Sequence, residues 1–259
     1  GDLCGHDDPR RFSGVSHHPC VSPHRLMKLY EELAEWWPVF SPPKVFAKQA
    51  ASYARILQET CAPRRVLELG CGGGSVAYHL KKHFQMDLVD LSPEMLKMAA
   101  RLNPECPVHQ GDMRTIRLGS LFDAVFINDA VMYMTTERDL RMAMATAYTH
   151  LRPGGAALFV PDCTRETFLE RTEYGGGENG PRSGRYLAWM RDPDPSDTVY
   201  DVDFAILLSG KDGTRCVHDP HTFGVFPREC WLSWLEAEGF RARQVEGKKL
   251  MFLGIKATS

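Results

Sequence analysis

The most informative part of the sequence is Arg65-Val66-Leu67-Glu68-Leu69-Gly70-Cys71-Gly72-Gly73-Gly74. Its apolar half predicts a buried strand that runs into a glycine-rich turn and then into a helix. Glycine tolerates positive φ and has no Cβ, so the backbone of such a turn can approach a ligand closely. The first amides of the following helix lack partners within the helix and face the same side. The stretch therefore predicts a nucleotide-binding turn.

The spacing of the glycines indicates which nucleotide is expected. Gly70, Gly72 and Gly74 alternate, whereas the dinucleotide-binding pattern G-x-G-x-x-G would place its third glycine at Ser75. An acidic residue, Glu68, lies two positions before the first glycine. This spacing disfavours NAD. A plain strand-to-helix connection is the alternative interpretation of the same turn.

Two more acidic residues follow strand-like runs at a regular interval. Asp90 ends the run 85–90 and lies 22 residues after Glu68, where a βαβ unit places an acid that accepts both hydroxyls of a ribose. Asp112 follows after another 22 residues. One acid at each strand end is the pattern of a nucleotide site. As alternatives, Asp90 also suits a helix start beside Ser92, and Asp112 suits a turn.

Five motifs follow one another along the chain: ELGCGGG, LVDLSPEML, QGDM, FDAVFIN (122–128) and LRPGG (151–155). In order and spacing they resemble the successive motifs of class I S-adenosylmethionine-dependent methyltransferases, specifically over residues 40–165 and more loosely over the whole chain. Within this class the chain is most similar to small-molecule tailoring methyltransferases of antibiotic and deoxysugar pathways. These include the amino-sugar N,N-dimethyltransferases, which share an HQGDMR-like segment.

The resemblance implies that the cofactor is S-adenosyl-L-methionine, and it assigns residues to the cofactor. Its methionine and ribose part would be lined by Glu68, Gly70, Gly72 and Gly74. Asp90 would accept hydrogen bonds from the ribose hydroxyls. These five residues come from the first two motifs of the series.

The remaining motifs would hold the two ends of the cofactor. The adenine ring would lie between Leu91 and Met113, with its amino group donating to Asp112. Asn128, at the end of the fourth strand, would face the methionine moiety. Tyr30 would lie on an N-terminal aromatic helix that covers the cofactor. The apolar residues of this set accord with the lining of a cofactor pocket.

Length and composition fit one α/β domain. A chain of 259 residues with 43% hydrophobic residues can bury a complete core as a single domain, which we expect over residues 21–259. The net charge is −2 and there is no long basic run, so the charge pattern of a nucleic-acid or membrane-surface binder is absent. We therefore expect a small-molecule substrate, no nucleic acid and no membrane. A homodimer is a further expectation.

The cysteines and the N-terminus predict a cytoplasmic protein. The eight cysteines contain no C-x-x-C pair, which favours free thiols in a reducing compartment. Residues 1–20 lack the apolar core of a signal peptide, and no run is long enough to span a bilayer. We expect residues 1–20 to be a mobile leader, with a metal-binding tail as the alternative.

Helical and strand periods alternate through the first two thirds of the chain. The fold class we expect is α/β, a Rossmann-like seven-stranded mostly parallel sheet with an inserted antiparallel β hairpin and an N-terminal helical lid. Helices are predicted at 23–36, 42–59, 75–82, 93–102 and 136–151, and strands at 65–70, 85–90, 108–111, 122–128 and 156–162.

The pattern changes after residue 162, and we expect residues 163–226 to form a lid and β insertion. Residues 163–198 are too rich in Gly and Pro for a packed element and predict a loop-rich segment. A hairpin follows at 199–209 and 214–225, because Gly210-Lys211-Asp212-Gly213 is a strong turn signal. In the resembling enzymes such an insertion helps to form the acceptor pocket. A helix at 228–238 and strands at 240–246 and 249–255, the last antiparallel, complete the sheet.

The expected chemistry is an in-line attack on the methyl carbon of a sulfonium. This cofactor is already activated, so the protein mainly aligns the reactants and excludes water, and a hydroxyl acceptor also needs a base. Tyr133 follows the fourth strand and would lie near the methyl group, with packing around a turn as the alternative. His218 and His221 are the candidate bases. At a period of two they point to opposite faces unless Pro220 introduces a bulge, so only one is expected to enter the pocket.

Metal and aromatic residues offer two further hypotheses. Cys216, His218 and His221 are suitable zinc or iron ligands, but a third ligand on one face is lacking, so we expect no metal and ordinary structural histidines instead. Substrate-binding aromatics are predicted at Trp37, Tyr186 and Trp189, because aromatic faces suit a sulfonium and a sugar-like acceptor. Amphipathic core packing is the alternative.

Three functions compete at this point. The first is O- or N-methylation of a small molecule of secondary metabolism by an S-adenosylmethionine-dependent methyltransferase. The second is a nucleotide-dependent oxidoreductase on a similar fold, and the third is a non-catalytic binding protein. Fold alone does not choose between them. The glycine spacing and the pair Asp90 and Asp112 disfavour the oxidoreductase, and the sequence leaves the acceptor atom open.

Overall fold

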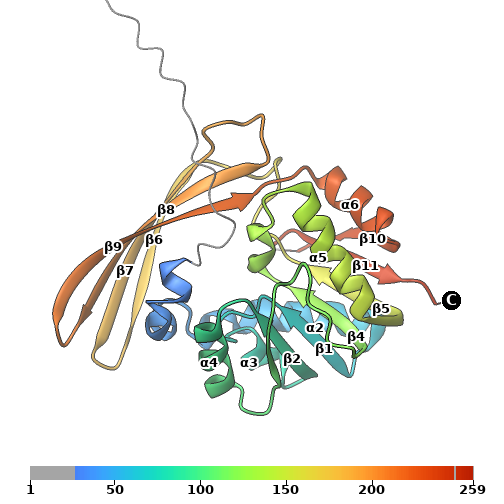
Figure 1. Cartoon of the computed structure of the whole chain (residues 1–259), viewed down its shortest axis with the longest axis horizontal. Coiled ribbons are helices and arrows are strands. Elements are labelled where there is room, and N and C mark those ends of the chain that lie inside the picture. Colours follow the sequence, from blue (N-terminus) through green and yellow to red (C-terminus); the bar gives the residue numbers. More distant parts are fainter. Residues whose placement is uncertain (1–26, 248, 259) are drawn as a thin grey trace, which may run out of the picture.

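The larger of the two sheets that the described residues form has seven strands, in the order β10-β11-β5-β4-β1-β2-β3 (Figure 1). The structure, a computed structural model, describes residues 27–247 and 249–258. Neighbours among β1 to β5 pair in parallel, whereas β11 is antiparallel to both β5 and β10. The expected mostly parallel sheet with an antiparallel last strand is confirmed. The strands are β1 (Arg65–Leu69), β2 (Gln85–Asp90), β3 (Val108–Gln110), β4 (Phe122–Ile127), β5 (Leu151–Phe159), β10 (Phe240–Val245) and β11 (Met251–Lys256).

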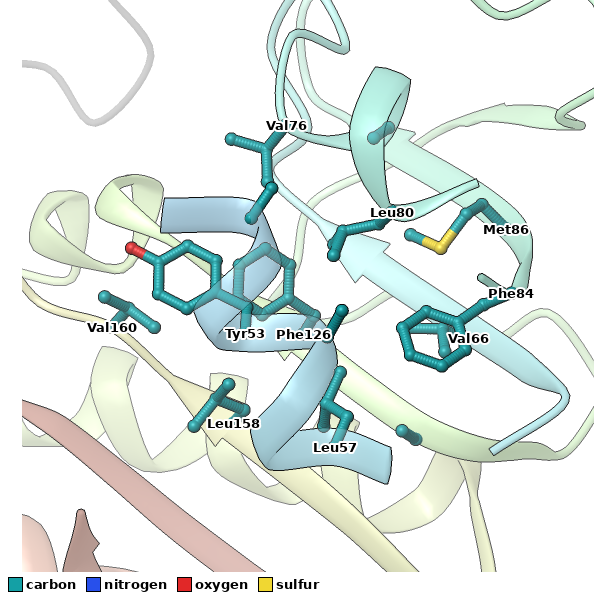
Figure 2. Packing of buried hydrophobic residues seen from close by; sticks show 14 of the residues in the cluster. Tyr53, Leu57, Val66, Val76, Leu80, Phe84, Met86, Phe126, Leu158 and Val160 are labelled. Atoms are coloured by element: carbon teal, nitrogen blue, oxygen red, sulfur yellow. The ribbon is translucent and has the colours of Figure 1, made fainter. Parts of the chain in front are cut away.

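Helices cover both faces of this sheet. α2 and α3 pack on one face, and α5 and α6 pack on the other. Figure 2 shows Tyr53 and Leu57 of α2 against Phe126 of β4 in the first of these cores. Strands that are buried on both faces are nearly continuous apolar runs, which explains why the sequence predicts them well. The helices are α2 (Ala47–Cys61), α3 (Ala77–Leu80), α4 (Pro93–Leu102), α5 (Glu137–His150) and α6 (Arg228–Ala237).

Two helices begin at side-chain caps that the sequence signals correctly. Oγ of Ser92 accepts from the amide of Met95 at 3.1 Å, at the start of α4. The hydroxyl of Thr136 accepts from the amide of Asp139 at 3.1 Å, at the start of α5. Such caps satisfy amides that have no partner within the helix. The predicted bounds of these two helices agree with the structure to within one residue.

The second sheet is antiparallel, with its four strands in chain order (Figure 1). Its second half confirms the predicted hairpin, which closes through a two-residue turn between Gly210 and Gly213. The pairing along it is continuous, so Pro220 introduces no bulge; it is tolerated because its strand lies at the sheet edge. The strands are β6 (Arg171–Asn179), β7 (Arg182–Arg191), β8 (Val199–Gly210) and β9 (Gly213–Gly224).

The prediction of a loop-rich segment over residues 163–198 is wrong, because β6 and β7 form a long hairpin there. Its glycines reflect close packing. A Cβ on Gly177 would lie 2.5 Å from the carbonyl oxygen of Val39, and a Cβ on Gly184 would lie 2.5 Å from the ring of Phe40. The glycines therefore allow the hairpin to approach the N-terminal segment, a use of glycine in strands that resembles a loop in sequence.

The N-terminal segment also differs from its prediction. In the described part of the predicted helix over 23–36, the chain forms two short 3₁₀ helices (η) joined by a turn, and the expected leader at 1–20 lies outside the described residues. Figure 1 shows this segment between the two sheets. Leu33 is buried against Ile206 and Leu208 of β8. The short elements are η1 (Lys28–Tyr30), η2 (Ala34–Trp36), α1 (Trp37–Phe40) and η3 (Pro43–Phe46).

The first of these turns is held from outside. The amides of Lys28 and Leu29 donate to the carboxylate of Asp219 on β9, at 3.2 and 2.9 Å. The side chain of Ser92 donates to the carbonyl oxygen of Tyr30 at 2.7 Å. These tertiary bonds replace the bonds of a regular helix, which periodicity alone does not reveal. The predicted single domain, with residues 163–226 as its lid and insertion, stays a prediction.

The part of the chain that the structure describes contains neither a candidate membrane-spanning helix nor a disulfide. No helix within it is both long and apolar enough to cross a bilayer. Its six cysteines, Cys61, Cys71, Cys106, Cys163, Cys216 and Cys230, are all free thiols.

We expect Gly74→Ala to destabilise the fold more than Gly180→Ala, although both glycines have positive φ, of 76° and 59°. A Cβ at residue 74 would lie 2.4 Å from Nδ2 of Asn103, whereas nothing lies within 4 Å at residue 180. Backbone strain should cost about 1 kcal/mol at residue 180, and strain with overpacking about 2–4 kcal/mol at residue 74. Chemical unfolding measures both; equal losses would contradict this packing.

Candidate active site

The carboxyl ends of β1 and β2 meet at the glycine turn. The amides of Gly70 and Cys71 both donate to the carbonyl oxygen of Val89, and the amide of Gly72 donates to Oδ2 of Asp90 at 2.7 Å. The parallel order β2-β1-β4 places this turn at the edge where ligands bind in open α/β sheets. The predicted strand–turn–acid arrangement is therefore present in space as well as in sequence.

The glycines of the turn serve different purposes. Gly70, Gly72 and Gly74 have φ values of 76°, 53° and 76°, which favour glycine. A Cβ on Gly70 would lie 2.4 Å from Cβ of Ala130, and one on Gly74 would collide with α4. The indole of Trp37 covers the middle of the turn, at Gly72 and Gly73. Two of the three predicted glycines thus serve packing within the protein.

Two buried acceptors lie at this edge without partners. Oε2 of Glu68 and Oδ1 of Asn128 have no hydrogen-bond partner in the structure, although the two residues are 2% and 8% exposed. Burial, reinforced by the nearby charges of Asp90 and Asp129, raises the pKa of Glu68 to about 8. Buried polar atoms in proteins are rarely left unpaired. Both acceptors therefore fit a ligand that brings hydrogen-bond donors, as a nucleoside and an ammonium group do.

Asp90 is anchored from both sides. Its Oδ1 accepts from the amide of Ser92 at 2.9 Å, and its Oδ2 accepts from Gly72. Burial raises the pKa of this carboxyl, although the amide bonds oppose the shift. Each carboxylate oxygen can accept a second bond, so two adjacent hydroxyls suit it. Leu91 beside it is 42% exposed and offers an apolar surface.

Asp112 has an unexpected partner. Arg114 donates to it from both Nε and Nη2, with the Nη2–Oδ2 distance at 2.6 Å, and also donates to Asp139 at 3.0 Å. Such a two-point contact fixes the carboxylate plane. Met113, which separates Asp112 from Arg114 in the sequence, is half-buried, and its methyl group lies beside Gly70. Asp112 is thus a positioned acceptor, and its contact with adenine stays a prediction.

Three side chains from distant segments form a hydrogen-bonded chain. The hydroxyl oxygens of Tyr30 and Tyr133 lie 2.9 Å apart, and that of Tyr133 lies 2.9 Å from Nδ1 of His221. Nε2 of His221 lies 3.1 Å from Oδ2 of Asp219. His221 is 3% exposed and Asp219 2% exposed. The arrangement links a buried carboxylate to a tyrosine hydroxyl near the glycine turn.

Asp219 keeps its charge despite its burial. Burial opposes ionisation, but the bonds from His221 and from the amides of Leu29 and Lys28 outweigh it, so the pKa of this carboxyl lies below its ordinary value. Burial raises the pKa of Tyr133 well above its ordinary value, so its hydroxyl stays protonated. The network therefore contains one fixed negative charge and two neutral phenols.

Around this chain lie aromatic rings that the sequence did not single out. The ring of Phe223 lies 4.8 Å from that of Tyr133, and the ring of Phe204 lies 4.9 Å from that of His221. Trp37, predicted to contact substrate, lies 5.6 Å from Tyr30 and against the glycine turn. The structure thus brings Trp37 to the side of the turn where Gly72 and Gly73 lie.

Three predicted residues lie elsewhere. His218 is exposed on the outer face of the second sheet, bound to Asp203 at 2.6 Å, as the period-two argument allows for one of the two histidines. Trp189 lies on the same outer face, 50% exposed and beneath the guanidinium of Arg191. Tyr186 lies on the inner face but packs against Phe40 in the N-terminal segment. None of the three contacts Tyr133 or His221.

The three candidate metal ligands, Cys216, His218 and His221, all lie on β9. Cys216 is exposed, and His218 and His221 project to opposite faces of the strand. Within residues 27–247 and 249–258, no group of three or more His, Cys, Asp or Glu side chains is arranged to hold a metal ion. The three candidate ligands therefore do not converge.

Sequence reasoning missed Asp219, which orients His221 and holds the N-terminal segment. A signal was present, because Asp219 and His221 are two residues apart and so share a face of their strand. It also missed Lys249, whose Nζ lies 2.7 Å from Oδ1 of Asp129 and 3.0 Å from Oδ1 of Asp162. No sequence motif marks this cluster, which assembles from three separate loops.

Comparison with known proteins agrees with this geometry. A family model described as a methyltransferase domain matches residues 66–155. The chain is 30% identical over 222 residues to dTDP-3-amino-3,4,6-trideoxy-alpha-D-glucopyranose N,N-dimethyltransferase of Streptomyces venezuelae, covering 83% of this chain and 92% of that protein.

Solved structures show the same similarity. The sugar N-methyltransferase KedS8 from a Streptoalloteichus species is 26% identical with a TM-score of 0.78, covering 98% of this chain and 100% of that one. The amino pentose methyltransferase CalS10 of Micromonospora, solved with S-adenosylmethionine bound, is 26% identical with a TM-score of 0.73, covering 82% and 92%. The chain therefore belongs to the S-adenosylmethionine-dependent methyltransferases, in the family that includes the amino-sugar N,N-dimethyltransferases.

Proposed function

We propose that this methyltransferase transfers methyl groups to the amino nitrogen of a nucleotide-linked deoxyamino sugar. The observation that carries the proposal is the chain of hydrogen bonds from Tyr30 through Tyr133 and His221 to Asp219. Relatives that act on such sugars support it. Family membership favours this small-molecule methyltransferase over the oxidoreductase and the non-catalytic binding protein.

The chain of hydrogen bonds can carry one proton away from an amine. In the structure the hydroxyl of Tyr133 donates to that of Tyr30. Rotation of the two hydroxyls about their C–O bonds gives the state that accepts a proton. With a neutral His221, Tyr30 then donates to Tyr133, Tyr133 donates to Nδ1, and Nε2 donates to Asp219, which leaves the Tyr30 oxygen able to accept from a substrate N–H. If the substrate proton passes to Tyr30, each hydroxyl hands its own proton on, and Nδ1 is protonated. Nδ1 then donates to Tyr133 and Tyr133 donates to Tyr30, as in the structure, whereas Nε2 still donates to Asp219. The imidazolium is stabilised by the fixed charge of Asp219.

An amine acceptor fits this relay better than a hydroxyl. An amino sugar is largely protonated near neutral pH, and because an ordinary alkylammonium is only a few pKa units less acidic than an ordinary imidazolium, passing its proton to an imidazole costs little compared with the barrier. A sugar hydroxyl holds its proton far more strongly than an imidazolium does. S-adenosylmethionine, when bound, supplies an electrophilic methyl group, so the freed nitrogen needs only alignment. Tyr30 is the residue that we propose to touch the accepting nitrogen.

We keep the cofactor-binding residues that the resemblance implies and add the groups that position two of them, Asp90 and Asp112. We propose that Asp90 accepts from the ribose hydroxyls, in the geometry set by the amides of Gly72 and Ser92. Asp112, held by Arg114, would accept from the adenine amino group. The exposed side chain of Leu91 would lie on the adenine ring, opposite the half-buried Met113 named above.

The acceptor pocket is proposed to differ from the sequence expectation. Phe204, Phe223 and Trp37 take the aromatic positions near Tyr30 and His221 that were expected of Tyr186 and Trp189. His221 replaces the pair His218 and His221 as the relay base. Apolar ring faces of this kind suit the flat side of a deoxysugar and exclude water from the cation.

We also propose that the enzyme is cytoplasmic and forms a homodimer. The free thiols of the described cysteines accord with a reducing compartment. Tyr174, Leu187, Trp189 and Leu207 are exposed on the outer face of the second sheet, where an uncovered antiparallel sheet would ordinarily be polar. Because that face bears mutually paired charges such as Arg191 and Asp203, an identical face is a suitable partner for it.

The function is tested with a panel of acceptors. We expect dTDP-linked 3-amino- or 4-amino-deoxyhexoses to gain one and then two methyl groups with S-adenosylmethionine, whereas the matching hydroxy sugars gain none. Mass spectrometry of the products shows how many methyl groups each acceptor carries. Methylation of the hydroxy sugars with no methylation of the amines would refute an amine acceptor.

We expect His221→Ala to lower kcat about 100-fold near neutral pH, as loss of a general base does, with S-adenosylhomocysteine binding retained. The loss should shrink at high pH, where the substrate amine deprotonates unaided. Tyr133→Phe, which keeps the ring, should show the same pH-dependent loss. His218→Ala, on the other face of the same strand, is the matched control and should stay within about twofold. A loss that is constant across pH would indicate a structural role for His221.

We expect the stability of the unliganded protein to fall as pH rises from 5 to 8. Burial raises the pKa of Glu68 from 4.5 to about 8, so over this window the folded state binds more protons than the unfolded state. The contribution is complete below the unfolded pKa and is lost through about pH 8, with a slope of up to about 1.4 kcal/mol per pH unit. Chemical unfolding across pH measures the slope. Glu68→Gln should flatten it, and an unchanged slope would contradict this assignment.

A further inference from the structure

Unpaired polar atoms gather at one end of the cofactor site. Among the described residues, nine buried side-chain nitrogen or oxygen atoms lack a hydrogen-bond partner, and five of them belong to residues at the glycine turn or beside it. Two are donors, the hydroxyl of Tyr53 and Nε1 of Trp37. The other three are acceptors, of Glu68, Asn128 and Asn103, and Asn103 lies on the far side of the turn, toward α4. Since an unpaired buried group is costly, such a set indicates a missing partner with both kinds of atoms.

Tyr53 is outside every motif of the family. It lies on α2, its ring packs 5.1 Å from that of Phe126, and it is 2% exposed. Figure 2 shows its hydroxyl at the margin of the core, between Val76 beyond the glycine turn and Val160 beyond β5. The amide of Val160 donates to the carbonyl oxygen of Ile127, so this margin adjoins the end of β4. The hydroxyl therefore points toward the edge where Asn128 lies.

The ammonium group of Lys249 lies in the same region. Lys249, on the connection between β10 and β11, binds Asp129 after β4 and Asp162 after β5. These bonds use two of its three N–H donors. Burial raises the pKa of Tyr53 to about 12, and the charge of Lys249 opposes that shift, which places its ammonium within electrostatic reach of the hydroxyl. The geometry agrees, because Lys249 binds Asp162, two residues after Val160, and the hydroxyl of Tyr53 lies on the Val160 side of its core, so both donors adjoin the segment that follows β5.

The order of the strands indicates which end of the cofactor lies near Tyr53 and Lys249. With its ribose on Asp90 of β2, the cofactor must extend in one direction toward β3 and in the other across β1 toward β4 and β5. The adenine assignment to Asp112 and Leu91 takes the first direction. The α-amino acid end of the cofactor then lies over the ends of β4 and β5. It carries a carboxylate, which needs donors, and an ammonium, which needs acceptors.

We propose that Tyr53 and Lys249 bind the α-carboxylate of the cofactor's amino acid end, while Glu68 and Asn128 accept from its ammonium. The unpaired donor and acceptors then gain partners of opposite character, and the third N–H of Lys249 is used. The proposal rests on the orientation given under the proposed function, with the ribose on Asp90. It does not depend on which acceptor is methylated.

The test compares two ligands that differ only at this end. S-adenosylhomocysteine carries the amino acid, whereas 5′-deoxy-5′-methylthioadenosine keeps the adenosine and sulfur without it. By calorimetry, Tyr53→Phe should weaken S-adenosylhomocysteine binding about tenfold, the loss of one hydrogen bond to a charged group, and leave methylthioadenosine binding within about twofold. Tyr148→Phe, on α5 beside Phe240 at the opposite face of the sheet, is the matched control and should change neither.

A second variant and a stability measurement separate a loss of cofactor binding from a loss of folding. Lys249→Gln keeps hydrogen-bonding capacity toward the aspartates but removes the charge, and it should also weaken only S-adenosylhomocysteine. Tyr53→Phe removes an unpaired buried hydroxyl, so thermal stability without ligand should be unchanged or higher. Equal weakening of both ligands, or of neither, would overturn the proposal. Because no acceptor is present, failure here is distinct from failure of the amine assignment.

Discussion

The acceptor side that we propose depends on one buried carboxylate. Asp219 accepts from two amides of the N-terminal segment and from the ring of His221. It therefore joins β9, the relay and the segment that carries Tyr30 and Trp37. Because these bonds keep Asp219 ionised, it holds the segment in place and also prepares the imidazole for a positive charge. The carboxylate of Asp219 therefore fixes the position of the N-terminal segment and also supplies the negative charge beside His221.

The cofactor side is tied to this arrangement through Ser92. Its amide donates to Asp90, its hydroxyl oxygen caps α4, and its hydroxyl proton goes to the carbonyl oxygen of Tyr30. Ser92 thus connects Asp90, which we assign to the ribose, directly to Tyr30, which we assign to the accepting nitrogen. Since an in-line transfer is sensitive to small displacements, a short rigid connection between the two partners favours alignment.

The sequence predicts those parts of the molecule whose signals are local. Buried parallel strands are apolar runs, and the caps at Ser92 and Thr136 mark helix starts, so the main sheet and its helices could be located. The β6–β7 hairpin could not be located, because its glycines are required by close contacts with Val39 and Phe40, which are far away in the sequence. The parity of β9 predicted that the two histidines would lie on opposite faces, and the packing of the sheet shows that His221 is the buried one. Lys249 depends on three loops meeting, which no local pattern encodes.

The two sheets divide the work of the enzyme. The carboxyl edge of the parallel sheet gathers Glu68, Asp90 and Asp129, which suits a cofactor that brings cationic and hydroxyl donors and is the same for every acceptor. The inner face of the antiparallel sheet supplies His221 and Phe204, whose neighbours can change without disturbing the parallel core, since the two sheets share no strand. The relay through Tyr133 crosses between them, because Tyr133 follows β4 while His221 belongs to β9. The position of that contact therefore constrains where an accepting nitrogen can lie, whatever sugar carries it.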